Sequence, residues 1–306
     1  MITVTQSYGG NFIVPIRIPN LRCQGVPPGG PADPLLARLV SHLSQNQTVL
    51  ELTAPITLVT DCLTQIAIAA PRNSACIPDH PTMCLGLISA SPSTSLTIHA
   101  PKTGFRVYLS WTGLNSQSLL PTPISTGQSL ASSNNHFSSS VILDPVLIPP
   151  PTETIRYLYI IENATQIHCQ TTPAISRIGN RLSFDILDSN EIPPQTASAK
   201  TSPHLFHNLA PNTRSEPSTH GTIQVTPDNQ LLIHGPDGPT LGGYPKIGTI
   251  IEADLPSLAQ LRPGQQIELI PVSLEVALDL RRESALQLQK TLHQINQALR
   301  IAHNST

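Results

Sequence analysis

The hydrophobic and polar positions in the first half of the chain follow the rhythm of short β-strands. Apolar residues alternate with polar ones or form brief runs, and Pro, Asn, Ser and Gly interrupt them every few residues. This pattern is typical of a barrel or a sandwich. The segment 11–19 carries two prolines, which predict an edge strand. The other strands predicted in this half lie at 48–53, 56–60, 65–70, 95–100 and 105–111.

The second half repeats this pattern. Its predicted strands lie at 154–161, 180–187, 221–225, 230–235, 247–254 and 266–272. The polar segments 112–140 and 188–219 show little apolar periodicity and are predicted to be loops. The proline-rich segment 145–153 is the best candidate for a linker, because a proline run makes a stiff spacer.

Two segments have helical periodicity. Residues 33–44 place five apolar side chains at helical spacing, with Asp33 at the N-cap position and Pro34 at the first helical position. The segment 273–303 is the clearest helix, and its apolar stripe predicts docking on the body of the protein; a groove on a partner is the alternative. The stripe consists of Leu288, Leu292, Ile295 and Leu299.

These elements predict a mainly β fold with two β-rich halves of similar size and a C-terminal helix. The corresponding domains are 1–147, 148–272 (with the glycine-rich loop described below) and 273–306. A chain of 306 residues is long enough for two such cores.

Composition excludes several classes of function. Charged residues make up only 12% of the chain and the net charge is −2, so the basic surplus of a nucleic-acid binder is absent. No apolar run has the length of a membrane span, and the first residues lack the pattern of a secretory signal, so we expect a cytoplasmic protein. Five scattered cysteines predict reduced, buried thiols, and Cys76-x₃-His80-x₃-Cys84 matches no strong zinc pattern, so no metal site is expected.

The densest group of special residues is the loop 234–245, which is rich in Gly and Pro. Adjacent glycines let a backbone approach a ligand closely, and successive N–H groups can bind an anion. A wide turn between barrel strands is the alternative interpretation. His234 ends the preceding strand, where a neutral imidazole is suited to act as an acid or a base.

The run 221–264 resembles the signature of the biotin-dependent carboxyltransferase family, roughly G-x-I-Q-V-P…D-x-Q-T-T-G-G-Y-P-x-I…A-D-L…L-A-Q-L-x-P-G. The segment 25–35 is similar to the family's G-V-P-P-S-G-A-M-D-P-L. The matching residues of the run are Gly221, Ile223, Gln224, Val225, Asp237, Thr240, Gly242, Gly243, Tyr244, Pro245, Ile247, Ala253, Asp254, Leu255, Leu258 through Leu261, Pro263 and Gly264.

The resemblance implies two cyclophilin-like β-barrel subdomains and a smaller cyclophilin-like partner subunit. The most similar branch is the C-type subunit of 5-oxoprolinase, which implies a B-like and an A-like partner protein, a small amide substrate, and ATP shared with a partner. Covalently attached biotin is not expected on this chain, because the usual Met-Lys-Met context is absent.

The candidate site residues follow from the matched positions and from the loop. The catalytic candidates are Asp237, Glu216 and His234. The substrate-binding candidates are Gln224, Thr240, Gly242, Gly243, Tyr244, Arg177, Gly25, Pro27 and Pro28. Among them, Arg177 is chosen as a nearby cation for an anionic substrate.

Three functions stay open at this point. The first is a subunit of an ATP-dependent complex that opens 5-oxoproline to glutamate. The second is a carboxyltransferase that acts on urea or a related amide with a separate carrier of carboxybiotin. The third is a non-enzymatic binding or regulatory homologue, which is favoured by the loss of the family's polar residues at 12–18 and 114–120 and by Pro239 in place of its Gln.

Overall fold

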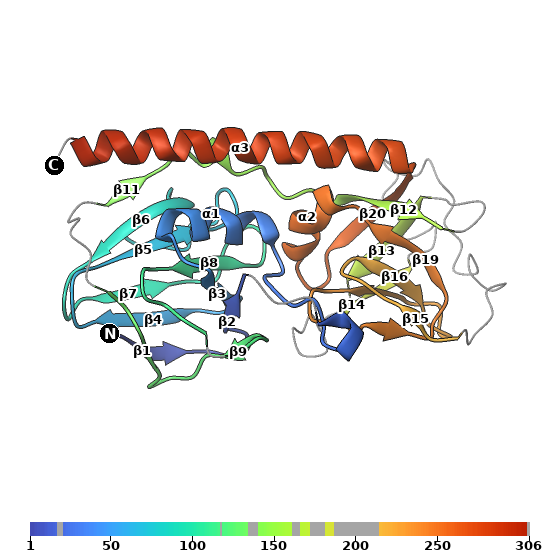
Figure 1. Cartoon of the computed structure of the whole chain (residues 1–306), viewed down its shortest axis with the longest axis horizontal. Coiled ribbons are helices and arrows are strands. Elements are labelled where there is room, and N and C mark those ends of the chain that lie inside the picture. Colours follow the sequence, from blue (N-terminus) through green and yellow to red (C-terminus); the bar gives the residue numbers. More distant parts are fainter. Residues whose placement is uncertain are drawn as a thin grey trace. The chain divides into compact units, whose positions relative to one another are not determined.

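The computed structural model describes residues 1–16, 21–116, 118–133, 140–160, 166–171, 181–186 and 214–304, with only the backbone for 181–186, 303 and 304 (Figure 1). The chain divides into two compact units. Unit 1 comprises Met1–Ile18, Asp33–Pro151 and Ala285–Thr306. Unit 2 comprises Pro19–Ala32 and Thr152–Ser284. The predicted three-part division stays a prediction; the units differ from it in the arm 19–32 and in the C-terminal helix, which contributes to both.

Unit 1 contains two sheets that share one hydrophobic core. The four-stranded sheet has the order β10 (Ser129–Leu130), β1 (Ile2–Ser7), β4 (Ile56–Thr60) and β7 (Ser95–Ile98). The seven-stranded sheet has the order β11 (Val141–Ile142), β6 (Leu85–Ala90), β5 (Thr64–Ala69), β8 (Val107–Ser110), β3 (Thr48–Leu52), β2 (Phe12–Pro15) and β9 (Thr122–Pro123). A short 3₁₀ turn, η2 (Pro145–Leu147), lies in the predicted linker.

Helix α1 (Pro34–Ser44) confirms the helix predicted at 33–44 and packs against β5 and β8 of unit 1 (Figure 1). The Asp33 carboxylate accepts hydrogen bonds from the N–H groups of Leu35 and Leu36, both at 3.0 Å, so it occupies the N-cap as predicted. The helix ends at Gln45, which adopts a left-handed conformation.

A buried polar network fixes the position where α1 begins. Tyr108 Oη donates to Glu51 Oε2 at 2.8 Å and accepts the Asp33 N–H, also at 2.8 Å. Arg106 Nε lies 3.4 Å from Glu51 Oε1, and both side chains are almost fully buried. Burial, followed by the nearby Glu51 charge, raises the pKa of Tyr108 well above its usual value. Tyr108 is therefore a neutral hydrogen-bond donor at physiological pH.

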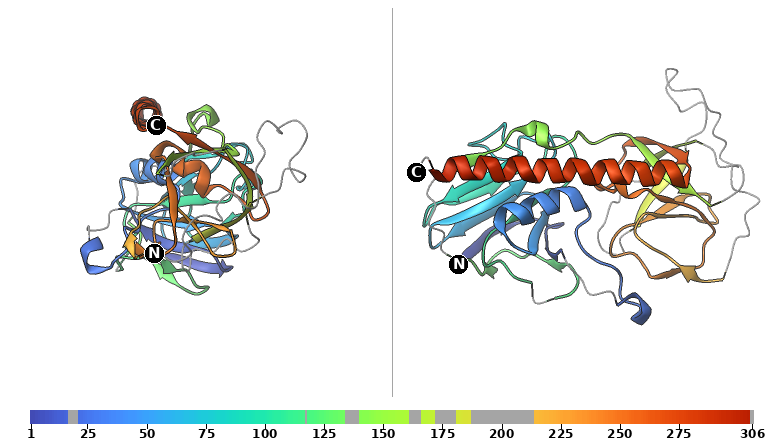
Figure 2. Two further views of the ribbon diagram at one scale, coloured as in Figure 1. Left: turned by 90° about the vertical axis from the view of Figure 1, so that its right-hand side faces the viewer. Right: turned by 45° about the horizontal axis from the view of Figure 1, so that its top comes forward.

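Helix α3 (Leu274–Asn304) is one continuous helix (Figure 2). Ile295 is fully buried in the core of unit 1, and the other three residues of the predicted stripe pack against that core. The predicted docking face is thereby confirmed. Among the helices of the described ranges, none combines the length and the low charge that crossing a membrane requires.

Unit 2 contains a closed barrel. Around it, the strands follow the order β12 (Thr154–Tyr159), β19 (Lys246–Ile250), β16 (Thr222–Val225), β17 (Leu231–His234), β14 (Arg181–Ile186), β13 (Ile167–Thr171) and β20 (Gln266–Val272). A separate two-stranded antiparallel sheet pairs β15 (Glu216–Pro217) with β18 (Leu241–Gly242). The short helical segments are η1 (Arg22–Gln24), η3 (Glu252–Asp254) and α2 (Leu255–Ala259).

The mainly β class with a C-terminal helix is confirmed, but some local predictions are wrong. β2 is not an edge strand, because β9 pairs with its outer side. β9, β10 and β15 lie inside segments predicted to be loops; each has two residues, which is too short to show a period. β1, β6 and β13 were not predicted at all. Three of the five cysteines are buried as predicted, whereas Cys23 is exposed and Cys62 is half-buried.

Candidate functional site

The barrel of unit 2 carries a layer of polar side chains on its outer face. Ile223 and Val225 of β16 and Ile233 of β17 point into the barrel core. Because side chains alternate along a strand, Gln224 and His234 lie on the opposite face. They are nevertheless almost completely buried, at 1% and 0% exposure. The loop that follows β17 therefore covers a polar layer rather than an apolar one.

The polar layer has a defined direction of hydrogen bonding. Gln224 Nε2 donates to the carbonyl oxygen of Tyr244 at 3.1 Å. Its other amide atom, Oε1, lies 2.9 Å from His234 Nε2. Because an amide oxygen only accepts, His234 carries its proton on Nε2 and donates it to Gln224. The three residues form a chain from the end of β17 to the backbone of the glycine-rich loop.

Gly242 packs directly against the Gln224 amide in the middle of these hydrogen bonds. A Cβ atom at position 242 would lie 2.4 Å from Gln224 Nε2 and 3.1 Å from both Cδ and Oε1. Any other residue would displace the Gln224 amide, since contacts below 3 Å require a shift. The tight packing explains the glycine here: the loop backbone must touch the amide beneath it.

The two-stranded β15–β18 sheet joins the loop to the segment 216–219. Glu216 pairs with Gly242, and the Ser218 N–H donates to Thr240 O at 2.8 Å. Lys246 at the start of β19 reaches the same segment, where Nζ donates to Pro217 O at 2.6 Å and lies 3.2 Å from Glu216 Oε2. The Lys246 side chain is 11% exposed and that of Glu216 is 60% exposed.

The arm 21–32 belongs to the same unit, although nearly 200 residues separate it from this segment in the sequence. Arg22 of η1 donates to Ser218 O and, at 3.1 Å, to Thr219 Oγ1. The Gly29 N–H donates to Pro236 O at 2.8 Å. The two segments that carry the family resemblance are therefore in contact within unit 2.

The remaining candidate residues lie in the glycine-rich loop and in the arm. Asp237 lies in a turn that the Gly238 N–H closes onto Gly235 O at 3.0 Å, and it is half-buried. Gly243 and Tyr244 are also half-buried. In the arm, Gly25 ends η1 in a left-handed conformation (φ 79°), and the half-buried Pro27 and Pro28 follow it. Arg177 lies outside the described residues.

Asp254, which matches the A-D-L part of the signature, has a structural environment. Its Oδ2 accepts the Arg156 N–H at 2.6 Å and Nε at 2.9 Å, while Oδ1 accepts Nη2 at 2.6 Å. The hydrogen bond with Asp254 raises the pKa of Arg156. Asp254 therefore ties the start of α2 to β12 and is not a candidate for contact with substrate.

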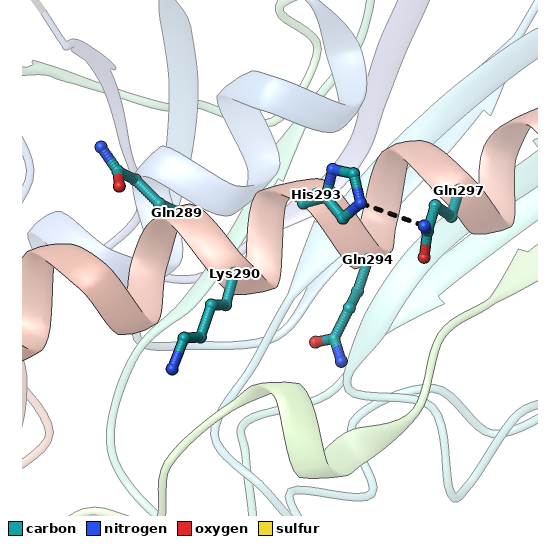
Figure 3. A pocket seen from close by; sticks show the side chains of 5 residues that line it. All are labelled: Gln289, Lys290, His293, Gln294 and Gln297. Carbon is teal, nitrogen blue, oxygen red and sulfur yellow. Dashed lines mark hydrogen bonds between the residues drawn. The ribbon is translucent and has the colours of Figure 1, made fainter.

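The structure also identifies residues that the sequence analysis missed. Arg22 and Lys246 contact the segment 216–219, and Ser218 is a buried member of it, yet none was selected, because a single cation or serine carries no spacing signal. A hollow on α3 lies apart from every motif in sequence, and its five polar side chains include a His293–Gln297 hydrogen bond of 3.0 Å (Figure 3). It is lined by Gln289, Lys290, His293, Gln294 and Gln297.

Comparisons with known proteins agree with this geometry. The family model of the carboxyltransferase domain, subdomain A and B, matches residues 24–120 and 152–271. A segment of 70 residues is 46% identical to the C-type subunit of 5-oxoprolinase from Haemophilus influenzae, and it covers 23% of each protein. A segment of 61 residues is 38% identical to urea amidolyase of Lachancea kluyveri, covering 20% of this chain and 3% of that protein.

The fold is also present in a solved structure. The crystal structure of the Kluyveromyces lactis urea carboxylase superposes with a TM-score of 0.71 and 20% sequence identity, over 95% of this chain and 29% of that one. At this identity the likeness establishes the fold alone. The family match extends over both β-rich parts of the chain and includes the arm and the glycine-rich loop. The chain therefore belongs to the carboxyltransferase domain family, with its subdomains A and B.

Proposed function

We propose that this chain is a subunit of a complex that opens an amide bond, with the lactam of 5-oxoproline as the first candidate substrate and glutamate as the product. The observation that carries the proposal is the hydrogen-bonded chain from His234 through Gln224 to Tyr244 O, with Gly242 packed on the Gln224 amide. This arrangement fixes the backbone of the glycine-rich loop from below. The similarity of one segment to a 5-oxoprolinase component supports the choice of substrate.

Opening an amide requires stabilisation of the negative charge that develops on the carbonyl oxygen. Preorganised backbone N–H groups do this well, because they need no reorientation when the charge appears. In this proposal other N–H groups of the glycine-rich loop near Gly242-Gly243 supply them, since the N–H of Gly242 itself faces Glu216 in the β15–β18 pair. Gln224 is a positioning residue, because its Nε2 holds the carbonyl of Tyr244, which follows these glycines. His234 is fully buried and acts through Gln224, whose orientation it fixes by donating a hydrogen bond to Oε1.

The proposal includes partner proteins. We infer a smaller cyclophilin-like subunit of the B type and a further protein of the A type, because the similar Haemophilus influenzae protein is named as the C-type subunit of its enzyme. ATP, which would supply the driving force for opening a stable lactam, is proposed to be used by the complex and shared with a partner. Glu216 and Asp237 remain candidates for moving protons at the loop.

A second candidate is transfer of a carboxyl group to urea or a related amide. The similarity to a urea amidolyase segment favours it. In that case carboxybiotin on a separate carrier would supply the activated carboxyl group, and this chain would bind and orient the amide. A homologue that binds an amide without turnover is the third outcome that the experiment below distinguishes.

The test is ATP-dependent release of glutamate from 5-oxoproline by this chain co-expressed with its candidate partner subunits. Gln224→Leu should reduce the rate at least about tenfold, since it removes the central residue and both hydrogen bonds of the chain. The matched control is Gln287→Leu on the exposed surface of α3, which should keep the wild-type rate.

Three results are informative. Glutamate that appears only when this chain is present supports the proposal. Carboxylation of urea by the same complex with a carboxybiotin carrier, in place of glutamate release, supports the second candidate. A complex that co-purifies but converts neither substrate leaves a non-catalytic binding role as the better account.

A further inference from the structure

Two cations contact consecutive carbonyl groups of the segment 216–219. Lys246 Nζ donates to Pro217 O at 2.6 Å, and the Arg22 guanidinium donates to Ser218 O. Among the described residues the acceptors of Arg22 are neutral, namely this carbonyl and Thr219 Oγ1. Two positive charges thus lie at one short segment, Arg22 from the arm and Lys246 from the start of β19.

Among the described residues, the one carboxylate in an ion pair with either cation is that of Glu216, and it reaches Lys246 alone. Glu216 Oε2 lies 3.2 Å from Lys246 Nζ, but the Glu216 side chain is 60% exposed, whereas that of Lys246 is 11% exposed. An ion pair with so exposed a carboxylate contributes little, because water competes for it and the side chain loses entropy. Glu216 can therefore leave Lys246 at small cost, and another carboxylate can replace it.

A buried hydroxyl at the same place has no partner of its own. Ser218 is 1% exposed, and within the described part of the chain no group accepts from or donates to its Oγ. Buried hydroxyls normally form a hydrogen bond, because an unsatisfied one is unfavourable. An oxygen-rich ligand on the 216–219 segment offers such a partner.

We propose that Arg22 and Lys246 bind the carboxylate of the substrate, with Glu216 occupying that position while the site is empty. The inference rests on the proposed function and narrows it to small amides or lactams that carry a carboxylate group. An arginine presents parallel N–H donors that match a carboxylate, and a lysine adds a point charge. 5-Oxoproline has such a group beside its lactam, whereas urea has none.

The experiment measures binding to the purified full chain by titration calorimetry. The ligands are 5-oxoproline and its neutral carboxamide, which keeps the same lactam ring. We expect the wild type to bind 5-oxoproline at least about tenfold more tightly, since hydrogen bonds to a charged group are stronger than those to a neutral one.

The variants of the cations and of Glu216 should change the affinity for 5-oxoproline in opposite directions. Lys246→Gln and Arg22→Gln should each weaken 5-oxoproline binding about tenfold and leave the carboxamide unaffected. Glu216→Gln should tighten 5-oxoproline binding, because it removes the competing carboxylate. A tightening cannot result from a folding defect. Arg300→Gln, on the exposed surface of α3, is the matched control and should change neither affinity.

Each other outcome is decisive. Equal affinity for the two ligands, or no change in the Lys246 and Arg22 variants, overturns the carboxylate site and leaves the proposed amide chemistry standing. Weaker binding in Glu216→Gln overturns the idea that Glu216 competes with the ligand. Binding of neither ligand by the wild-type chain overturns the carboxylate site, whereas the proposed function is tested separately by glutamate release with the partner subunits.

Discussion

The two units of this protein each bury polar side chains, but in different ways. In unit 1, Glu51, Arg106 and Tyr108 form a network that ends on the Asp33 backbone and serves the start of α1. In unit 2, the polar groups are the buried Gln224–His234 pair and the ion pair of Lys246 with the exposed carboxylate of Glu216.

This difference separates structural polar groups from candidate functional ones. The unit 1 network has its acid, base and hydroxyl partners inside the protein, so removing one member should harm folding first. In unit 2, the partner of Lys246 is the exposed Glu216, which a ligand can replace, and the buried Ser218 hydroxyl has no hydrogen-bond partner among the described residues. Removing a member there should harm binding or catalysis before stability.

The largest expected effect is on the unit 1 network. Glu51→Ala should lower the free energy of unfolding by about 3–5 kcal/mol, because it leaves the buried Arg106 without its carboxylate partner. Urea denaturation followed by circular dichroism measures this. A loss below about 1 kcal/mol would contradict a closed structural network, since exposed pairs give losses of that size.

The Gly242 packing gives the next effect. Gly242→Ala should displace the Gln224 amide, reduce turnover at least about tenfold and lower the free energy of unfolding by about 1–3 kcal/mol. Kinetics of glutamate release and urea denaturation measure the two quantities. Gly9→Ala is the matched control, because a Cβ at position 9 meets nothing within 4 Å. Equal activity of the two variants would show that the Gln224 contact has no catalytic importance.

A smaller loss of stability is expected when only the hydroxyl of Tyr108 is removed. Tyr108→Phe removes the hydroxyl that links Glu51 to the Asp33 N–H and should lower the free energy of unfolding by about 1–2 kcal/mol. Affinity for 5-oxoproline should stay unchanged. A variant that keeps full stability but loses affinity would break the distinction between the two units.

The smallest effect concerns thiol labelling. Burial raises the pKa of the Cys84 thiol in unit 1 to about 11, while Cys23 on the unit 2 arm is exposed. A raised pKa keeps the thiol protonated until the pH approaches that value, so iodoacetamide at about pH 8 should modify Cys23 and spare Cys84. Mass spectrometry of the labelled peptides measures this. Rapid modification of Cys84 in the folded chain would show that the core of unit 1 opens readily.

Several predictions from sequence hold because they rest on local physics. Asp33 and Pro34 signal the start of α1, and Ile295 with its neighbouring leucines marks the docking face of α3. The long strands of the barrel also carry alternation that is visible in the sequence. The two-residue strands β9, β10 and β15 carry none, because their hydrogen bonds depend on where a distant strand lies.

The site divides in the same way. The motif and the loop identify Gln224, His234 and Gly242, and the structure brings them into contact. The motif also includes Asp254, which the structure places in an ion pair with Arg156. Sequence alone could not separate these roles. It shows that an aspartate belongs to the signature, but not whether that aspartate forms a salt bridge or lies in an active site.

By itself, the sequence determined the mainly β class, the two main helices, and the family through the run 221–264 and the segment 25–35. Only the tertiary structure decided that the arm 19–32 joins unit 2, that Gln224 and His234 are buried on the outer face of the barrel, and that Arg22 and Lys246 meet at the segment 216–219. The reason is physical. Periodicity and capping act over a few residues, whereas burial and ion pairing depend on contacts between segments that the chain separates widely.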